Sequence, residues 1–297
     1  MAKYQILAFD GGGVCGALSA AILQRLAAAY PLLLPNTTTF AGTSTGGLIA
    51  SLLACGHGAQ DAVDLYVNDG AKCFTSSTWR NLTKMWGLAE ADYDTAGIEA
   101  VLDGVVGDRL LRETNKTLIM PTSLVIGPAA PQIVVMSSYL TNAYCGITIK
   151  EADLRTSAAP TYFPIRGVYC DGAMWANSPA GVAVDEIRTQ PGNASLTTDD
   201  FLIMRFGTGL VPMNLDPEDL DLGAVEWLRY LVPTFLGLQQ KLTDTEMRQY
   251  FGGRYFCVNP ATQKIAIDDV TQIPSLVAAG DAYDLAPAVA YLRGYAW

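Results

Sequence analysis

The sequence predicts an α/β fold built on a central, mainly parallel sheet with helices on both faces. Short apolar runs rich in branched residues alternate with segments whose apolar residues recur at helical spacing. The chain shows no internal repeat and no linker long enough to separate two cores. We therefore expect a single domain over residues 1–297, with a mostly helical C-terminal part from about residue 215.

The same patterns predict the individual elements. Six apolar runs are expected to form strands, at 4–9, 38–41, 117–126, 132–137, 166–170 and 201–206. Residues 16–30 and 45–55 have the spacing of crossover helices. Residues 217–250 should be helical with an irregular apolar face, for which core packing is the simpler interpretation and a lid or lipid-facing wall the alternative. The residues of that face are Trp227, Leu228, Leu231, Phe235, Leu236 and Leu238.

The charge of the chain argues against several kinds of partner. With 19 basic and 29 acidic residues the formal net charge is -10, and no Lys/Arg-rich run could neutralise a phosphate backbone, so nucleic acid is not expected. The same charge opposes adsorption to anionic membranes, which leaves apolar surface or a pocket for contact with lipid. The N-terminal apolar run is too short for a signal peptide, and no run reaches the roughly 20 apolar residues that cross a bilayer. We expect a soluble, cytoplasmic protein whose six cysteines are reduced and mostly buried.

The sharpest local signal is a strand end that runs through G-x-S-x-G into a helix rich in small residues, between Phe40 and Leu48. This is the nucleophile-elbow pattern, in which a tight reversal holds the serine in strained backbone geometry. Gly42 and Gly46 remove the side chains that would clash in such a turn. Ser44 is therefore the candidate nucleophile, exposed above a helix N-terminus whose dipole favours negative charge.

A serine hydroxyl needs an adjacent base, and the chain has a single histidine. His57 follows at or beyond the far end of the helix that Ser44 begins, which at ~1.5 Å per residue is on the order of 15–20 Å away. This excludes a Ser-His-Asp triad and leaves carboxylates as candidates. Asp171 fits best because it ends an apolar run and precedes small residues that allow close approach; a structural turn aspartate before Gly172 is the alternative interpretation. Burial would raise its pKa and amide donors would lower it. The acids within 217–226 are weaker candidates.

A second strand-to-helix turn, D-G-G-G-V-C-G, runs from Asp10 to Gly16. Its glycines satisfy the dinucleotide fingerprint G-x-G-x-x-G, but no acid lies between Asp10 and Asp61 to hold a ribose. A Walker loop is excluded as well, since no Gly-Lys-Ser/Thr follows. The remaining chemical use is an oxyanion hole, whose amides would face the tetrahedral oxygen formed when Ser44 attacks an ester. The candidate donors are Gly11, Gly12, Gly13 and Val14.

In chain order, these three elements resemble the patatin-like phospholipase family, whose members combine a glycine-rich oxyanion loop, G-x-S-x-G and a later D-G-A/G. The matching residues are 10–16, 42–46 and 171–173, and the segments 156–164 and 206–209 are also similar to those of the family. The resemblance covers residues 4–210, and the part after 215 is not matched in detail.

The resemblance implies a three-layer α/β/α fold and a lipid acyl hydrolase that cleaves ester bonds of phospholipids or other acyl lipids. It also implies a dyad of Ser44 and Asp171 that works without histidine through an acyl-enzyme intermediate, with no metal or organic cofactor. The expected partner is an acyl lipid substrate, which the enzyme could meet at a membrane surface.

One position departs from the family pattern, because Cys15 stands where the oxyanion loop usually carries Arg or Lys. The missing cation bears on phospholipid head-group preference more than on ester hydrolysis, since the backbone amides remain. We interpret Cys15 as a small packing residue rather than a competing nucleophile. It is also the main support for an alternative function, a catalytically silent lipid-binding or interaction protein on the same scaffold. A nucleotide-binding protein is a third hypothesis.

Overall fold

The computed structural model describes residues 2–73, 95–160, 162–210, 224–262 and 266–297, and for 224–232 the course of the backbone alone. The strands in these residues form one sheet in the order β4-β3-β2-β1-β6-β7, with β5 also paired to β3. Their bounds are β1 Tyr4–Phe9, β2 Thr39–Gly42, β3 Thr117–Leu124, β4 Gln132–Ser137, β5 Tyr169–Asp171, β6 Phe201–Phe206 and β7 Tyr255–Val258.

The middle of the sheet is parallel. β1 pairs in parallel with β2 and β6, β2 with β3, and β6 with β7, whereas β4 and β5 run antiparallel to β3. The expected mainly parallel sheet is thus confirmed. Because β1 and β2 are in register from Ile6↔Thr39 to Phe9↔Gly42, their carboxyl ends lie together at one edge, where ligands of open α/β sheets bind.

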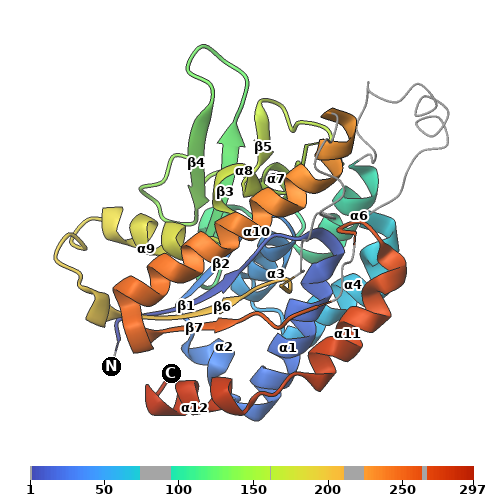
Figure 1. The fold of residues 1–297 in the computed structure, drawn as a ribbon. Helices are drawn as coiled ribbons and strands as arrows, with labels where there is room; N and C mark the ends of the chain where they lie inside the picture. Colours follow the sequence, from blue (N-terminus) through green and yellow to red (C-terminus); the bar gives the residue numbers. More distant parts are fainter. Residues whose placement is uncertain (1, 74–94, 161, 211–223, 263–265) are drawn as a thin grey trace.

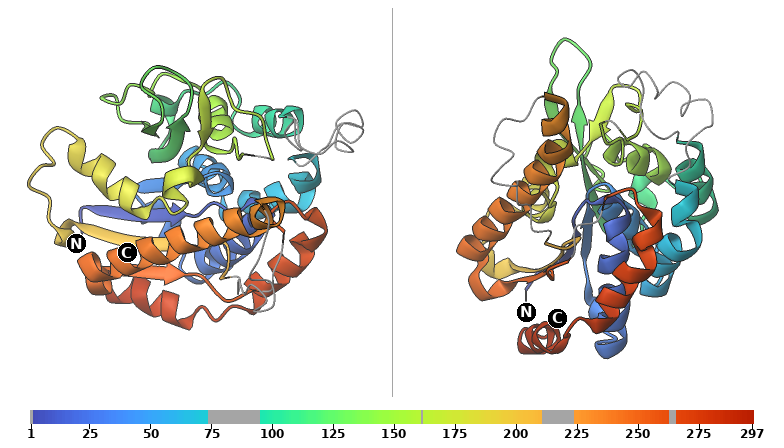
Figure 2. Two further views of the ribbon diagram at one scale, coloured as in Figure 1. Left: turned by 45° about the horizontal axis from the view of Figure 1, so that its top comes forward. Right: turned by 45° about the vertical axis from the view of Figure 1, so that its right-hand side comes forward.

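Helices cover both faces of this sheet (Figures 1 and 2). α10 crosses one face obliquely beside α9, while α1, α3, α4 and α11 lie on the other. The helix bounds are α1 Gly16–Ala29, α2 Leu33–Asn36, α3 Thr45–Ala54, α4 Ala59–Cys73, α6 Ala96–Val105, α7 Ile149–Thr156, α8 Ala173–Ala176, α9 Ala180–Thr189, α10 Ala224–Phe251, α11 Ile273–Ala282 and α12 Ala286–Gly294.

Strand alternation divides the core in two. Side chains along a strand point to opposite faces in turn, so β1 sends Leu7 and Phe9 into the larger core and Ile6 and Ala8 into the smaller one. The larger core contains residues of α1, α3, α4, α11 and α12, and the smaller contains residues of α9 and α10. The three-layer α/β/α arrangement follows directly from this pattern.

All six expected strands and both crossover helices are present, with the fifth strand shorter than expected. The sequence did not predict β7 or the helices α2, α4, α6, α7, α8, α9, α11 and α12. The segment 217–250 forms the single helix α10 from residue 224 onward, and it contains Pro233. None of the helices in the described part of the chain combines the length and apolar character needed to cross a membrane.

The core-packing interpretation of the apolar face of this segment is wrong for the residues that can be assessed. Phe235 and Leu238 are 43% and 60% exposed, and Leu236 lines a cavity. The buried side of α10 is formed further along by Gln240, Met247 and Phe251. The side chains of Trp227, Leu228 and Leu231 lie outside the described residues.

Candidate active site

Ser44 lies at the turn between β2 and α3, with φ of 52° and ψ of -123°. A positive φ is unfavourable for a residue with a Cβ, and among the described residues other than glycine it occurs at Ser44 and Ala296. Two hydrogen bonds hold the turn. The Ser44 amide donates to Thr156 Oγ1 at 3.2 Å, and Thr43 Oγ1 donates to the Ala176 carbonyl at 2.7 Å. The backbone conformation expected from G-x-S-x-G is therefore present.

The glycines on either side of Ser44 allow backbone to pack directly on backbone. A Cβ on Gly42 would lie 2.0 Å from the carbonyl oxygen of Gly46, and a Cβ on Gly46 would lie 2.1 Å from that of Phe9. A side chain at either position would push α3 away from the ends of β1 and β2, so the pattern serves close packing as well as the turn.

Asp171 is the last residue of β5 and is almost completely buried. Its Oδ1 accepts a hydrogen bond from the Ala173 amide at 2.7 Å, and Ser123 Oγ donates to its backbone carbonyl at 3.1 Å. The following residue must be glycine, because a Cβ on Gly172 would lie 2.2 Å from the Pro121 carbonyl oxygen. Strand pairing and this close contact fix the carboxyl group in one place.

Burial and hydrogen bonding have opposite effects on the pKa of Asp171, and the effect of burial is the larger. Burial raises the pKa of Asp171 from 3.8 to about 7, while hydrogen bonds from the Ala173 amide and the Ser44 side chain act in the opposite direction. Desolvation therefore prevails, and the carboxyl group exchanges its proton near neutral pH. That is the range in which a carboxylate is effective as a general base.

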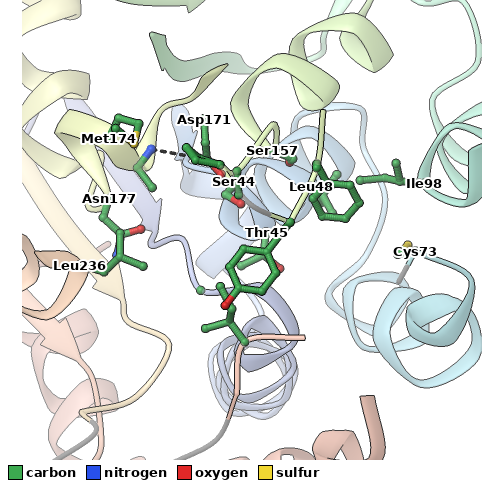
Figure 3. Close-up of a pocket in the computed structure, with 18 of the residues that line it drawn as sticks. Ser44, Thr45, Leu48, Cys73, Ile98, Ser157, Asp171, Met174, Asn177 and Leu236 are labelled. Carbon is green, nitrogen blue, oxygen red and sulfur yellow. Dashed lines mark hydrogen bonds between the residues drawn. The ribbon is translucent and has the colours of Figure 1, made fainter. Parts of the chain in front are cut away.

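Ser44 and Asp171 both line a cavity of about 430 Å³, within the usual size range of small-molecule sites. Figure 3 shows the two side chains next to each other at its centre. Leu48, Ile98 and Cys73 lie on one side of them, and Met174, Asn177 and Leu236 on the other. Most of the lining is apolar, so the cavity suits a hydrocarbon chain with one polar group near its middle.

The glycine-rich loop borders the same cavity through Gly12 and Gly13. The Gly11 amide donates to the Asn177 carbonyl at 3.0 Å, and the Val14 amide donates to the Ile267 carbonyl at 2.8 Å. Of the four candidate oxyanion donors, these two are therefore already engaged. Among the described residues, no hydrogen bond uses the amides of Gly12 and Gly13.

A buried ion pair lies directly beneath the loop. Arg205 Nε donates to both carboxylate oxygens of Asp10, at 2.9 and 3.0 Å, and both side chains are almost fully buried. Burial raises the pKa of Asp10, and the charge and hydrogen bonds of Arg205 oppose that effect. The pair fastens the end of β1, where the loop begins, to β6. Arg205 was not predicted from the sequence, although a charge within the apolar strand FLIMRF was an available signal.

Asn177 is a second residue that sequence reasoning missed. Its backbone carbonyl accepts from the Gly11 amide, and its Nδ2 donates to the Gly11 carbonyl at 3.3 Å. Both ends of Gly11 are thus held by one residue. The amide oxygen Oδ1 is buried and, among the described residues, has no hydrogen-bond partner. No local pattern could have linked Asn177 to a loop 166 residues earlier.

The other titratable candidates lie elsewhere or are buried. His57 contacts Asp61 at 3.6 Å and the Val105 carbonyl at 3.2 Å and does not line the cavity. Cys15 is buried, and burial raises the pKa of its thiol to about 12, in agreement with a packing role. The side chains of the acids in 217–226 lie outside the described residues. The described residues contain no group of three or more His, Cys, Asp or Glu that could hold a metal ion.

Comparison with known proteins places this site in a family. A family model described as patatin-like phospholipase matches residues 7–184, more than half of the chain. Protein teg of Priestia megaterium is 25% identical over 99% of both chains. A putative sporulation hydrolase, CotR of Bacillus subtilis, is 24% identical over 99% of this chain and 98% of its own length. A cGAMP-activated phospholipase of Pseudomonas aeruginosa is 26% identical over 86% of this chain and 78% of its own. The match over the residues that build the site shows that the chain belongs to the patatin-like phospholipase family.

Proposed function

We propose that the protein is a lipid acyl hydrolase that cleaves carboxylic ester bonds, with Ser44 as nucleophile and Asp171 as general base. Membership of the patatin-like phospholipase family supports lipid hydrolysis. The residue assignment is carried by one observation: a serine in strained backbone geometry shares the wall of an apolar cavity with a buried carboxyl group whose pKa is about 7.

The proposed acylation step uses both residues. Asp171 takes the hydroxyl proton of Ser44 as Oγ attacks the ester carbonyl carbon, and the carbonyl electrons move onto oxygen. The amides of Gly12 and Gly13 would hold that oxyanion, aided by the N-terminal end of the α3 dipole. When the tetrahedral intermediate collapses, the ester C–O bond breaks, and the departing alkoxide takes the proton from Asp171.

Deacylation repeats the sequence with water. Asp171 takes a proton from the water molecule that attacks the acyl-enzyme, and the second tetrahedral intermediate expels Ser44 Oγ. Ser44 recovers the proton from Asp171, and a fatty acid is released. A carboxylate with a pKa of about 7 can accept and return a proton in both steps.

The cavity supports an apolar acyl chain as the part of the substrate that enters. Leu48 and Ile98 lie to one side of Ser44, where such a chain could extend (Figure 3). Met174 and Phe235 line the cavity and are also 47% and 43% exposed, so apolar surface continues from the cavity to the outside of the molecule.

Lipid access is proposed at this opening, along the outer side of α10. A helix side that faces solvent is usually polar. Here positions spaced three and four residues apart on α10 are apolar and exposed: Phe235, Leu238 and Leu242. This supports contact with apolar lipid surface rather than with anionic head groups, in accord with the net charge of -10.

The test is fatty acid release from a panel of phospholipids, galactolipids, glycerides and lysolipids, with a short p-nitrophenyl ester as the soluble reference. Wild type should hydrolyse the soluble ester and at least one lipid class, and Ser44→Ala should hydrolyse neither. Ser51→Ala, two turns further along α3, is the matched control and should retain turnover. Turnover by Ser44→Ala would remove Ser44 from the mechanism. Lipid binding without any ester hydrolysis by wild type would favour the catalytically silent alternative.

A further inference from the structure

We propose that Gln239, on α10 and outside the region matched by the family model, is a positioning residue that holds the Ser44–Asp171 site in its working geometry. The inference rests on the proposed function, since it concerns the same site. Its basis is that one side-chain amide joins α10 to both ends of α8, the single helical turn that follows Asp171.

Both polar atoms of Gln239 are engaged. Oε1 accepts from the Asn177 amide at 3.0 Å, and Nε2 donates to the Ala173 carbonyl at 3.1 Å. α8 spans only Ala173–Ala176, so it is too short to satisfy most of its own backbone groups or to be stable alone. Gln239 supplies the donor and the acceptor that the two ends of this turn lack.

α8 contacts each part of the proposed reaction site. At its start, the Ala173 amide donates to Asp171 Oδ1 at 2.7 Å. At its end, the Ala176 carbonyl accepts from Thr43 Oγ1 at 2.7 Å, beside Ser44. The next residue, Asn177, binds both the amide and the carbonyl of Gly11. A shift of α8 would therefore disturb the base, the nucleophile turn and the glycine-rich loop together.

The neighbouring Gln240 supports the loop from its other side. Its Nε2 donates to Thr208 Oγ1 at 3.5 Å, and that hydroxyl donates to the Gly11 carbonyl at 3.0 Å. Its backbone carbonyl accepts from the Arg205 guanidinium at 3.3 Å, the group that pairs with Asp10. α10 is thus linked to Gly11 through two side chains. Gln240 acts through Thr208, and Gln239 acts through Asn177.

The test compares Gln239→Met with wild type on a short p-nitrophenyl ester. Methionine has similar length and flexibility but can form neither hydrogen bond. We expect kcat to fall about tenfold or more with KM nearly unchanged, because misplaced reacting groups slow the chemical step more than binding. The acid limb of kcat/KM against pH should also move to higher pH, because a loosened Ala173 amide stabilises the Asp171 carboxylate less.

Two further variants make the result decisive. Gln249→Met, at an exposed position on the same helix, is the matched control and should behave as wild type. Gln239→Glu keeps the acceptor for the Asn177 amide but loses the donor to the Ala173 carbonyl, so it should show a partial loss of kcat, and it decides the matter if Gln239→Met does not fold. A wild-type kcat and pH profile in the Gln239 variants, or equal changes in KM and kcat without a shift of the pH profile, would overturn the proposal. Failure of wild type itself to hydrolyse esters would instead count against the proposed function.

Discussion

Replacing Asp171 with asparagine should abolish ester turnover and yet make the folded protein more stable above neutral pH. Asparagine has nearly the same shape, and its side-chain oxygen can still accept from the Ala173 amide. It carries no charge at any pH, so burial no longer opposes a charged form. Loss of function and gain of stability would then come from the same change.

The size of the gain follows from the pKa of Asp171, which burial raises from 3.8 to about 7. Between these values the folded protein keeps the proton that the unfolded chain has lost, so wild-type stability falls as pH rises and levels off above 7. At 1.36 kcal/mol per pH unit, the full loss is about 4 kcal/mol, and more than half of it develops between about pH 5 and about pH 8.

Urea unfolding of wild type and Asp171→Asn over this range measures the effect. The stability of the variant relative to wild type should increase by about 2–3 kcal/mol from about pH 5 to about pH 8, since all other titratable groups are common to both proteins and cancel. A difference that stays constant with pH would refute the assignment of Asp171 as a buried group that binds its proton near neutral pH.

Further predictions concern catalysis, packing and lipid access. The value of kcat/KM on a short p-nitrophenyl ester should rise about tenfold per pH unit up to about pH 7 and then level off, because Asp171 must be ionised to act as base; a pH-independent profile would contradict this role. Gly46→Ala should destabilise the fold by about 1–3 kcal/mol in urea unfolding and reduce turnover, because its Cβ would lie 2.1 Å from a carbonyl oxygen of β1; an unchanged midpoint would contradict the close contact. Arg205→Met should lower stability by about 3–5 kcal/mol at neutral pH by leaving a buried carboxylate unpaired, and a small change there would show that the pair is not ionised. Leu238→Asp should reduce hydrolysis of vesicle lipid but not of the soluble ester, whereas Leu32→Asp, at a similarly exposed position in the turn before α2, should affect neither.

Strands β1 to β6, the helices α1 and α3, and the two proposed reacting residues could be anticipated because their requirements are local. A tight strand-to-helix turn needs glycine on both sides of Ser44, and a carboxylate that ends a strand before glycine can approach closely. Both requirements concern only a few residues that are neighbours in the sequence. Because the chain has one histidine, His57, and its position in the sequence is too far from Ser44, a carboxylate was left as the candidate base.

The support of the site could not be anticipated, because it depends on contacts between distant segments. Asn177 binds Gly11 across 166 residues, and Gln239 reaches Asn177 from a helix 62 residues further on. Composition and periodicity carry no information about such pairs. Arg205 is the exception, since a charge within a buried strand requires a partner, and that partner is Asp10 after the end of β1.

The C-terminal part was the least predictable region for a similar reason. β7 is a four-residue apolar run that periodicity cannot distinguish from a turn of helix. α10 carries apolar residues on its buried side and on its outer side, so its pattern has no single face. The position of the helix is explained by its contacts with α8 and the cavity, which its own sequence does not reveal.

The most direct test of the central claim is labelling with a fluorophosphonate, which reacts with an activated serine in place of an ester, followed by peptide mass spectrometry. We predict one adduct, on the peptide that contains Ser44, and strongly slowed labelling in Asp171→Asn. Modification of a different residue, or ester hydrolysis that continues in the fully labelled protein, would contradict a nucleophilic Ser44 activated by Asp171.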